Sequence, residues 1–487
     1  MKSKLLGLMA LACMLSLNTE AKVRLPHLVG DNMVLQQQTE ARLWGWADAG
    51  KTVKVTVSWN NDTYTAKADA QGKWMVSVKT PAASFTPLSI TFDDGEKTTL
   101  SNILSGEVWV CAGQSNMEMP LKGYNDCPVE GYNNVVADAI NSKGIRHAKI
   151  PSIMRMRPQE DADTEWIECN PNTVPDFSAT GYFFARMVSK TLQIPVGIIE
   201  ANKGGTRVES WFSEENLRKY TDETLDSLAN VKKYPMDFHR PMMWGNGTFH
   251  PILNYTVKGI VFYQGCSNTD DHREQYAERL AILAKQWREQ FGLGEIPFYY
   301  VQIAPYFQDN KNGVDGVNGA LLREQQFKAL SLIPNSDMVC TNDAVYPSET
   351  HNIHPTQKQK VGERLAFIAL NETYGMEAFR CKSPSYKEMK IKDNQVSLSF
   401  NDTYNGLTRQ YGFEGFEIAG ADRVFHKATQ TQSQYSWFTG ELSITISSDE
   451  VKEPVAVRYC FRNFQLGNVA NMAGLPLIPF RTDDWDQ

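Results

Sequence analysis

The chain has 487 residues, with 49 Lys and Arg against 56 Asp and Glu, which gives a formal charge of -7. This acidic balance offers no electrostatic basis for binding nucleic acid, and the length exceeds one ordinary domain, so we expect two or three. The eight cysteines lie far apart, without CxxC or Cys/His spacing, so the sequence predicts neither a disulfide framework nor a metal site.

The first 21 residues have the pattern of a secretion signal. Two lysines precede an apolar run over residues 5–17, and a small residue, Ala21, ends the segment. The run is shorter than the ~20 apolar residues that a membrane span needs. We therefore predict a periplasmic or extracellular protein without a membrane span, whose mature chain begins near Lys22. Removal of Cys13 with the signal leaves an odd number of cysteines, so at least one thiol should be free.

Residues 22–101 read as an N-terminal β-sandwich. Short alternating runs separated by Asp, Asn and Gly turn signals are typical of such a fold; they cover residues 41–47, 51–59, 63–69 and 72–80. Trp44, Trp46 and Trp74 in these runs are compatible with sugar binding, but packing in a core or an interface is the commoner use of aromatic side chains.

Residues 102–376 change to an α/β pattern. Apolar runs that alternate with longer helical segments indicate a parallel sheet covered on both faces; the runs are 108–112, 196–199, 259–263, 298–303 and 338–340. One expected helix places five large apolar residues on a single stripe, namely Tyr276, Leu280, Leu283, Trp287 and Phe291.

Residues 377–487 return to short strands and form a second β-rich region. The strand-like runs are 394–400, 413–420, 441–447 and 455–461. The overall prediction is an α/β domain with β-rich regions on either side.

Polar residues follow four of the expected strands of the α/β region. They are Gln114-Ser115-Asn116, the segments 202–206 and 264–268, and the segment 351–355 with His354 near its end. Ligands of open α/β sheets bind beyond the carboxyl ends of the strands. The sequence therefore predicts a site where these segments meet.

The residue types in these segments suit acyl transfer, which needs a nucleophile, a base and donors for an oxyanion. Ser115 is the candidate nucleophile and His354 the candidate base. The N–H groups of Ser115 and Gly205 and the amide of Asn268 are the candidate oxyanion donors. Pro355 is expected at the first position of a helix, whose apolar face would carry Val361, Leu365 and Ile368.

The motifs "GEVWVCAGQSNMEMP", "NKGGTRVESW", "VKGIVFYQGCSN" and "NIHPTQKQKVGERLA" resemble those of the sialate O-acetylesterase group of SGNH hydrolases. "DNMVLQQ" and "GLPLIPFRTDDW" extend the likeness to nearly the whole mature chain. The resemblance implies a flavodoxin-like α/β/α hydrolase domain flanked by β-rich domains. It implies hydrolysis of O-acetyl esters on sugars without a metal or organic cofactor, and it gives Ser115, His354, Gly205 and Asn268 the same roles.

The sequence departs from this group at two positions. Many relatives have Glu where this chain has Cys266, and simple SGNH enzymes have Asp three residues before the histidine, where this chain has His351. The group that orients His354 is therefore open between Asp343, Glu349 and no acid at all. Asp343 is slightly favoured because it ends the strand before the histidine loop.

The substrate is expected to be an O-acetylated glycan or sugar, with acetylated sialate favoured over hemicellulose or pectin. Gln114, Arg207 and Gln264 flank the strand ends and are predicted to contact it, and Arg207 could meet a sialate carboxylate, although a surface salt bridge is the simpler role. Cys266 keeps open a glycan-binding protein that has lost turnover. Cys266 as the nucleophile is disfavoured, because no motif supplies it with a base. The oligomeric state is not predicted.

Overall fold

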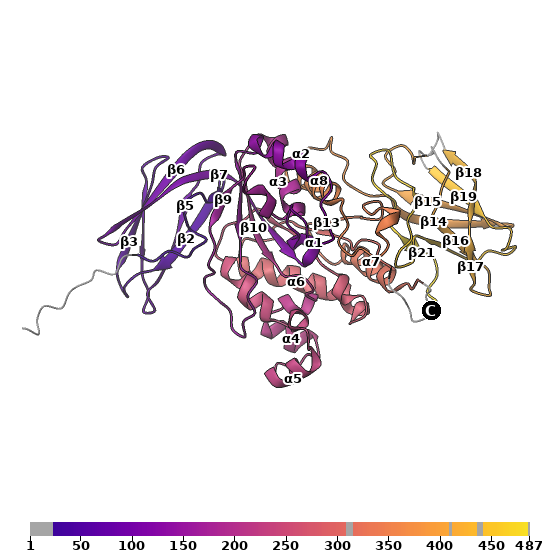
Figure 1. Ribbon diagram of the computed structural model, residues 1–487, viewed down its shortest axis with the longest axis horizontal. Coiled ribbons are helices and arrows are strands. Elements are labelled where there is room, and N and C mark those ends of the chain that lie inside the picture. Colours follow the sequence, from indigo (N-terminus) through magenta and orange to yellow (C-terminus); the bar gives the residue numbers. More distant parts are fainter. Residues whose placement is uncertain (1–22, 308–314, 409–411, 436–441, 486–487) are drawn as a thin grey trace, which may run out of the picture.

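The computed structural model describes residues 23–307, 315–408, 412–435 and 442–485. The predicted signal segment lies outside these residues. Three parts follow one another along the longest axis: a β domain, an α/β domain and a second β domain (Figure 1). No helix within the described ranges is long and apolar enough to cross a membrane.

The N-terminal domain contains the strands that the alternating runs predict. They are β2 (Glu40–Trp46), β3 (Thr52–Val57), β4 (Thr63–Lys67) and β5 (Lys73–Lys79); β1 (Val34–Gln36) and β6 (Ser84–Asp93) are present as well but were not predicted by those runs. Strand β2 pairs with β5, while β3 pairs with β4 and β6. Trp44 and Trp74 are buried and belong to the main hydrophobic core, which favours packing over sugar binding for both.

The long strand β7 (Lys97–Gly113) joins the first two domains. Its first part pairs with β6, and β1 pairs with it from Leu104 to Gly106. Its last part pairs with both central neighbours in the α/β sheet and ends at Gly113. The domain boundary expected between residues 101 and 102 therefore falls inside a continuous strand.

The α/β sheet has the strand order β13-β12-β11-β7-β10-β8-β9. The further strands are β8 (Ile145–Lys149), β9 (Trp166–Glu168), β10 (Val196–Asn202), β11 (Gly259–Tyr263), β12 (Phe298–Val301) and β13 (Ser336–Val339). All neighbours are parallel except β9, which is antiparallel to β8. The five predicted strands are confirmed, whereas the apolar runs did not predict β8 and β9.

Helices cover both faces of this sheet, as the predicted α/β/α class requires (Figure 1). α3 (Ala179–Leu192) and α8 (Lys358–Ile368) pack together on one face, and α6 (Tyr276–Phe291) and α7 (Asn318–Ala329) lie on the other. The shorter helices are α1 (Ser115–Glu118), α2 (Tyr132–Asp138), α4 (Glu214–Tyr220) and α5 (Ser227–Lys233). Short 3-10 or π turns include η3 (Val208–Trp211), η7 (Cys266–Asn268), η9 (Pro347–Glu349) and η10 (Ala369–Thr373).

Local sequence explains where two of the long helices begin and end. The Ser178 hydroxyl caps α3 by accepting from the Gly181 N–H at 3.0 Å. Helix α6 ends at Gly292, which adopts the left-handed conformation common at helix ends. All five residues of the predicted α6 stripe are buried, so the helical spacing identified the face that packs on the sheet.

The C-terminal domain consists of two four-stranded sheets, β14-β15-β19-β18 and β17-β16-β20-β21. The strands are β14 (Ser385–Lys392), β15 (Gln395–Asn401), β16 (Phe416–Ala419), β17 (Phe425–Lys427), β18 (Thr429–Tyr435), β19 (Leu442–Ser447), β20 (Ala456–Tyr459) and β21 (Phe480–Arg481). Their buried faces form a separate core, so the predicted β-rich region is confirmed.

A stability test follows from the end of β7. A Cβ atom on Gly113 would lie 2.2 Å from the carbonyl oxygen of Tyr263, and the φ of Gly113 is +139°. We expect Gly113→Ala to lower the free energy of unfolding in urea by about 3 kcal/mol or more. Gly294→Ala is the control, because Gly294 has a φ of +76° with nothing within 4 Å of the added Cβ; it should cost about 1 kcal/mol. Equal losses would contradict the close contact.

Candidate active site

The loops that follow three central strands are tied together by backbone hydrogen bonds. The N–H of Gln114, after β7, donates to the carbonyl of Tyr263 at the end of β11 (2.9 Å). The N–H of Lys203, after β10, donates to the carbonyl of Gly113 (3.0 Å). The predicted meeting of the strand ends is therefore present, and the turn that carries Ser115 lies at its centre.

Ser115 is the first residue of α1 and is half-buried. A Cβ atom on Gly204 would lie 3.3 Å from the Ser115 Cβ, so a side chain at position 204 would crowd the hydroxyl. The N–H groups of Ser115 and Gly205 have no hydrogen-bond partner among the described residues. This is expected for Ser115 as the first residue of a helix, whereas Gly205 lies in a turn. Both N–H groups remain available as oxyanion donors.

Glu118, on the same short helix, holds the glycine turn in place. Its Oε2 accepts from the Gly204 N–H at 2.6 Å, and its Oε1 accepts from the Ser152 hydroxyl at 3.5 Å. The Gly204 N–H is thus occupied, which separates its role from that of Gly205. Glu118 was not among the predicted site residues, because a carboxylate three residues after a serine has no distinctive pattern.

His354 lies in the loop before α8 and is half-buried. Its N–H donates to the Asn352 side-chain oxygen (2.9 Å), and the Asn116 amide donates to the neighbouring Ile353 carbonyl (2.9 Å). The Tyr124 ring meets the imidazole edge-on with centroids 5.1 Å apart, and the Tyr124 hydroxyl donates to the Ser115 carbonyl at 3.3 Å. The structure therefore brings Ser115 and His354 to the same site.

The electrostatic surroundings keep His354 neutral. Burial, together with the nearby ammonium of Lys358, lowers the pKa of the imidazole to about 4. The Cys127 sulfur lies 4.0 Å from the imidazole Nδ1, and no carboxylate bonds to the ring among the described residues. A neutral imidazole is the form that can take a proton from a hydroxyl.

Pro355 does not occupy the predicted first helical position, because α8 begins three residues later at Lys358. Side chains and neighbouring loops bind the intervening backbone instead. The Thr356 N–H donates to Glu349 Oε1 (2.9 Å), and its carbonyl accepts from the Glu130 N–H (3.0 Å). The predicted apolar face of the helix is confirmed, since its three members, Val361, Leu365 and Ile368, are buried.

Neither candidate acid contacts the imidazole. The two oxygens of Asp343 accept from Arg364 at 2.6 and 2.7 Å, and this pairing lowers the pKa of the carboxyl despite its burial. Glu349 accepts from the backbone N–H groups of Tyr346 and Thr356. The prediction that Asp343 or Glu349 orients His354 directly is thus contradicted by the geometry, because both carboxylates are engaged elsewhere.

Asn268 is also directed away from the site. It is fully buried, and its amide nitrogen donates to Glu209 Oε2 at 3.1 Å and to the Asp271 carbonyl at 3.4 Å. Its oxygen accepts from the Val208 N–H and from Gln264. The predicted oxyanion role of Asn268 therefore requires correction: its amide fixes the loops after β10 and β11.

The two glutamines predicted to contact substrate are structural as well. Gln114 is buried, and its side-chain oxygen accepts from the Gly265 N–H at 2.8 Å. Gln264 is buried, donates to the Thr206 carbonyl and accepts from the Tyr276 hydroxyl. Both ends of the Gln264 amide are thus bound within the protein, whereas only the side-chain oxygen of Gln114 is engaged by the strand-end backbone.

Arg207, the predicted partner of a sialate carboxylate, is 1% exposed. Its guanidinium pairs with Asp271 (2.6 Å) and Glu223 (2.8 Å), and it stacks 4.3 Å from the Tyr234 ring. Burial lowers the pKa of this guanidinium, but Glu209, 3.5 Å away, together with Glu223 and Asp271 raises it overall. Neither predicted role fits this geometry, because Arg207 is buried and its guanidinium is engaged by the buried Glu223 and the partly exposed Asp271.

Cys266 lies in the loop after β11, at the start of η7. Burial raises the pKa of its thiol to about 11, so the thiolate is scarce at neutral pH. Since the thiolate is the nucleophilic form, the chemistry of the site supports Ser115 over Cys266 as the nucleophile.

A cavity of about 320 Å³ adjoins this loop. Its lining includes Cys266 and Ile353, the residue before His354, and Asp270, Tyr306 and Arg323 contribute polar groups. Its volume falls within the range of small-molecule sites, and its mixed lining suits a ligand with both apolar and hydroxyl groups.

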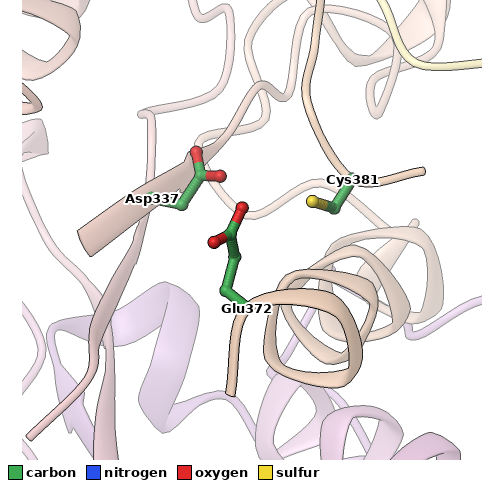
Figure 2. Close-up of side chains that lie close together, drawn as sticks. All are labelled: Asp337, Glu372 and Cys381. Atoms are coloured by element: carbon green, nitrogen blue, oxygen red, sulfur yellow. The ribbon is translucent and has the colours of Figure 1, made fainter. Parts of the chain in front are cut away.

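One cluster has the residue types of a metal site but lies away from these loops. Side-chain atoms of Asp337, Glu372 and Cys381 lie within 4.8 Å of one another (Figure 2). Asp337 is near the start of β13, whereas the site forms at the carboxyl ends of the strands. The Lys382 ammonium, 3.4 Å from Glu372, already supplies a positive charge there. The cluster therefore has no part in the chemistry at the strand ends.

Comparison with known proteins places this geometry in a family. Residues 105–371 match the family model described as carbohydrate esterase, sialic acid-specific acetylesterase. The chain belongs to this family. It is a carboxylic ester hydrolase with the fold of a carbohydrate acetylesterase.

Relatives extend the similarity beyond the α/β domain. The sialate O-acetylesterases of Homo sapiens and Pongo abelii are each 25% identical over 488 residues, covering 90% of this chain and 87% of theirs. The crystal structure of XAC1771, a carbohydrate acetylesterase from Xanthomonas citri, is 32% identical with a TM-score of 0.82, covering 95% of this chain and 100% of that one. The β domains thus belong to the shared architecture.

The corrected role of Arg207 can be tested by substitution. Arg207→Met leaves the buried carboxylate of Glu223 without its guanidinium partner, so we expect the free energy of unfolding to fall by about 3–5 kcal/mol. Arg218→Met removes an arginine from an exposed pair with Glu214, and this control should cost less than about 1 kcal/mol. A stable Arg207→Met enzyme with a raised KM would restore the substrate-binding role.

Proposed function

We propose that this esterase removes O-acetyl groups from a sugar, with Ser115 as the nucleophile and His354 as the base. The observation that carries the proposal is the convergence of a half-buried serine, a neutral histidine and two unpartnered N–H groups at the strand ends. Membership of the carbohydrate esterase family and the acetylesterase relatives support the same assignment.

The reaction proceeds in two balanced halves. The Ser115 oxygen attacks the acetyl carbonyl carbon while His354 takes the hydroxyl proton, and the N–H groups of Ser115 and Gly205 bind the oxyanion. Collapse breaks the bond to the sugar oxygen, which leaves with the proton from His354. Water then attacks the acetyl-enzyme, His354 takes and returns its proton, and acetate departs as the Ser115 hydroxyl re-forms.

The base acts as a dyad with Ser115 in this proposal, without an orienting carboxylate. The Asn352 side chain fixes the His354 backbone, and the edge of the Tyr124 ring limits rotation of the imidazole. The positive charge that develops on the imidazole is stabilised less than in a triad. This arrangement fits a low pKa for the ring.

The proposed substrates are O-acetylated sugars, with acetylated sialate favoured by the curated relatives. Because Arg207 is buried, it is not available to bind a sialate carboxylate. Acetylated glycans such as hemicellulose and pectin therefore stay as alternatives. Acetate release from acetylated sialate, xylan, xyloglucan and pectin separates them. Absence of acetate release from all four would favour a glycan-binding protein.

We also propose that the protein acts in the periplasm or outside the cell. The support is the apolar run over residues 5–17 behind two lysines. Amino-terminal sequencing of the protein from its host would locate the processing site.

Ser115→Ala should lower turnover by ~10³-fold or more, because the acetyl group then has no acceptor on the enzyme. Acetate release at saturating substrate measures the loss, and an unchanged melting temperature shows that the fold is intact. Ser331→Ala, at an exposed serine away from the site, is the matched control and should retain full turnover. Near-normal hydrolysis by Ser115→Ala would contradict the mechanism.

A pair of substitutions tests the dyad. Replacing an orienting carboxylate by its amide costs about 10⁴-fold in turnover in a triad. We expect Asp343→Asn to lose far less than that and to lose stability instead, because Arg364 is left without its bidentate partner. Glu349→Gln should cost about tenfold, since it disturbs the Thr356 contact in the histidine loop. A triad-sized loss from either variant at constant stability would identify the missing acid.

A further inference from the structure

Lys358 occupies an unusual position for a lysine. It is 2% exposed, and it is the only lysine with a buried side chain in the described part of the chain. It is also the first residue of α8, where the helix dipole disfavours a positive charge. Burial of a charged group is costly without a compensating partner, so this side chain calls for a functional explanation.

The contacts of Lys358 connect the two halves of the active site. Its ammonium donates to the Asn116 side-chain oxygen at 2.6 Å and to the Pro355 carbonyl at 2.8 Å. The Asn116 nitrogen donates in turn to the Ile353 carbonyl at 2.9 Å. One lysine and one amide thus join the residue after Ser115 to both residues that flank His354.

No carboxylate forms an ion pair with this ammonium among the residues described. The titratable groups that face it are Cys266 after β11, Cys127 after α1, Glu349 on η9 and His354 on its own loop. Glu349 is the only carboxylate among these four groups, but its oxygens already accept hydrogen bonds from backbone N–H groups. Burial lowers the pKa of Lys358 to about 7.

We propose that Lys358 is a positioning residue of the esterase site, which fixes the Ser115 turn against the His354 loop through Asn116 and keeps the imidazole unprotonated by charge repulsion. This role rests on the proposed function of Ser115 and His354. Well-packed apolar residues can replace buried ions at little or no cost in stability, so the stability of the fold alone does not require a lysine at this position.

The sign of the electrostatic effect is fixed by the charges. The Lys358 ammonium disfavours a second positive charge on the imidazole, which contributes to the His354 pKa of about 4. Neutral His354 is the active base, so activity should fall only as the pH drops through about 4. Without the ammonium, the pKa of His354 rises toward the ordinary value of about 6.5, and activity is lost at a higher pH.

The central experiment measures kcat/KM for p-nitrophenyl acetate against pH in the wild-type enzyme, Lys358→Met and Lys358→Gln. Both variants lose the positive charge, so in both the fall of kcat/KM on the acidic side of the pH profile should move to higher pH. Only Gln retains a donor for Asn116, so we expect kcat to fall by about 10- to 100-fold in Lys358→Met and by less in Lys358→Gln. Lys360→Met, which removes a half-exposed lysine two residues away, should leave this fall at its original pH.

A second measurement does not depend on turnover. The His354 ring, labelled with ¹⁵N and assigned with His354→Gln, should titrate near pH 4 in the wild-type protein and at a higher pH in Lys358→Gln. An unchanged His354 pKa in a folded variant that lacks the charge would overturn the proposal. A His354 pKa at or above about 6.5 in the wild-type protein would overturn it as well. A wild-type protein without esterase activity would instead overturn the proposed function, so the two failures are distinguishable.

Discussion

The continuous hydrogen bonding of β7 is the constraint on which the rest of the molecule depends. Over 17 residues this strand passes from the N-terminal sandwich into the centre of the α/β sheet, where β10 and β11 pair with its last part. The strand ends at the turn that carries Ser115, so the position of this residue is set by pairing on both sides. A single backbone segment thereby fixes the orientation of two domains and one reactive side chain.

Around that strand end the protein uses buried polar groups where an apolar core would be simpler. Arg207 with its acids and Asn268 with Glu209 satisfy one another beneath the loops after β10 and β11. Such networks rigidify a structure when every member has a partner. The loops around Ser115 are short and rich in glycine, so their backbones are intrinsically flexible. The buried polar network beneath them limits this flexibility. Residues that sequence motifs mark as catalytic can therefore serve the scaffold instead.

Sequence patterns located the five apolar strands, the covering helices and the meeting of the strand ends near Ser115, because hydrophobic periodicity and strand-end polarity are local properties. They failed where partners come from distant segments. The burial of Arg207 depends on Glu223 and Asp271, and the commitment of Asp343 depends on Arg364, none of which is visible from spacing. Strands β8 and β9 escape such patterns because they are short and carry polar residues such as Arg146 and His147, whose burial is compensated by tertiary contacts. The burial of Lys358 is equally invisible, because its partner Asn116 lies far away in the chain.

The seven cysteines of the described chain are all unpaired. Burial raises the pKa of each thiol, whether in the α/β core or the C-terminal domain. Thiol–disulfide exchange proceeds through the thiolate, so these side chains react slowly and serve as small apolar packing groups. Within the residues that the structure describes, the fold is therefore held together without a disulfide, and none of these thiols is a readily available partner for thiol–disulfide exchange.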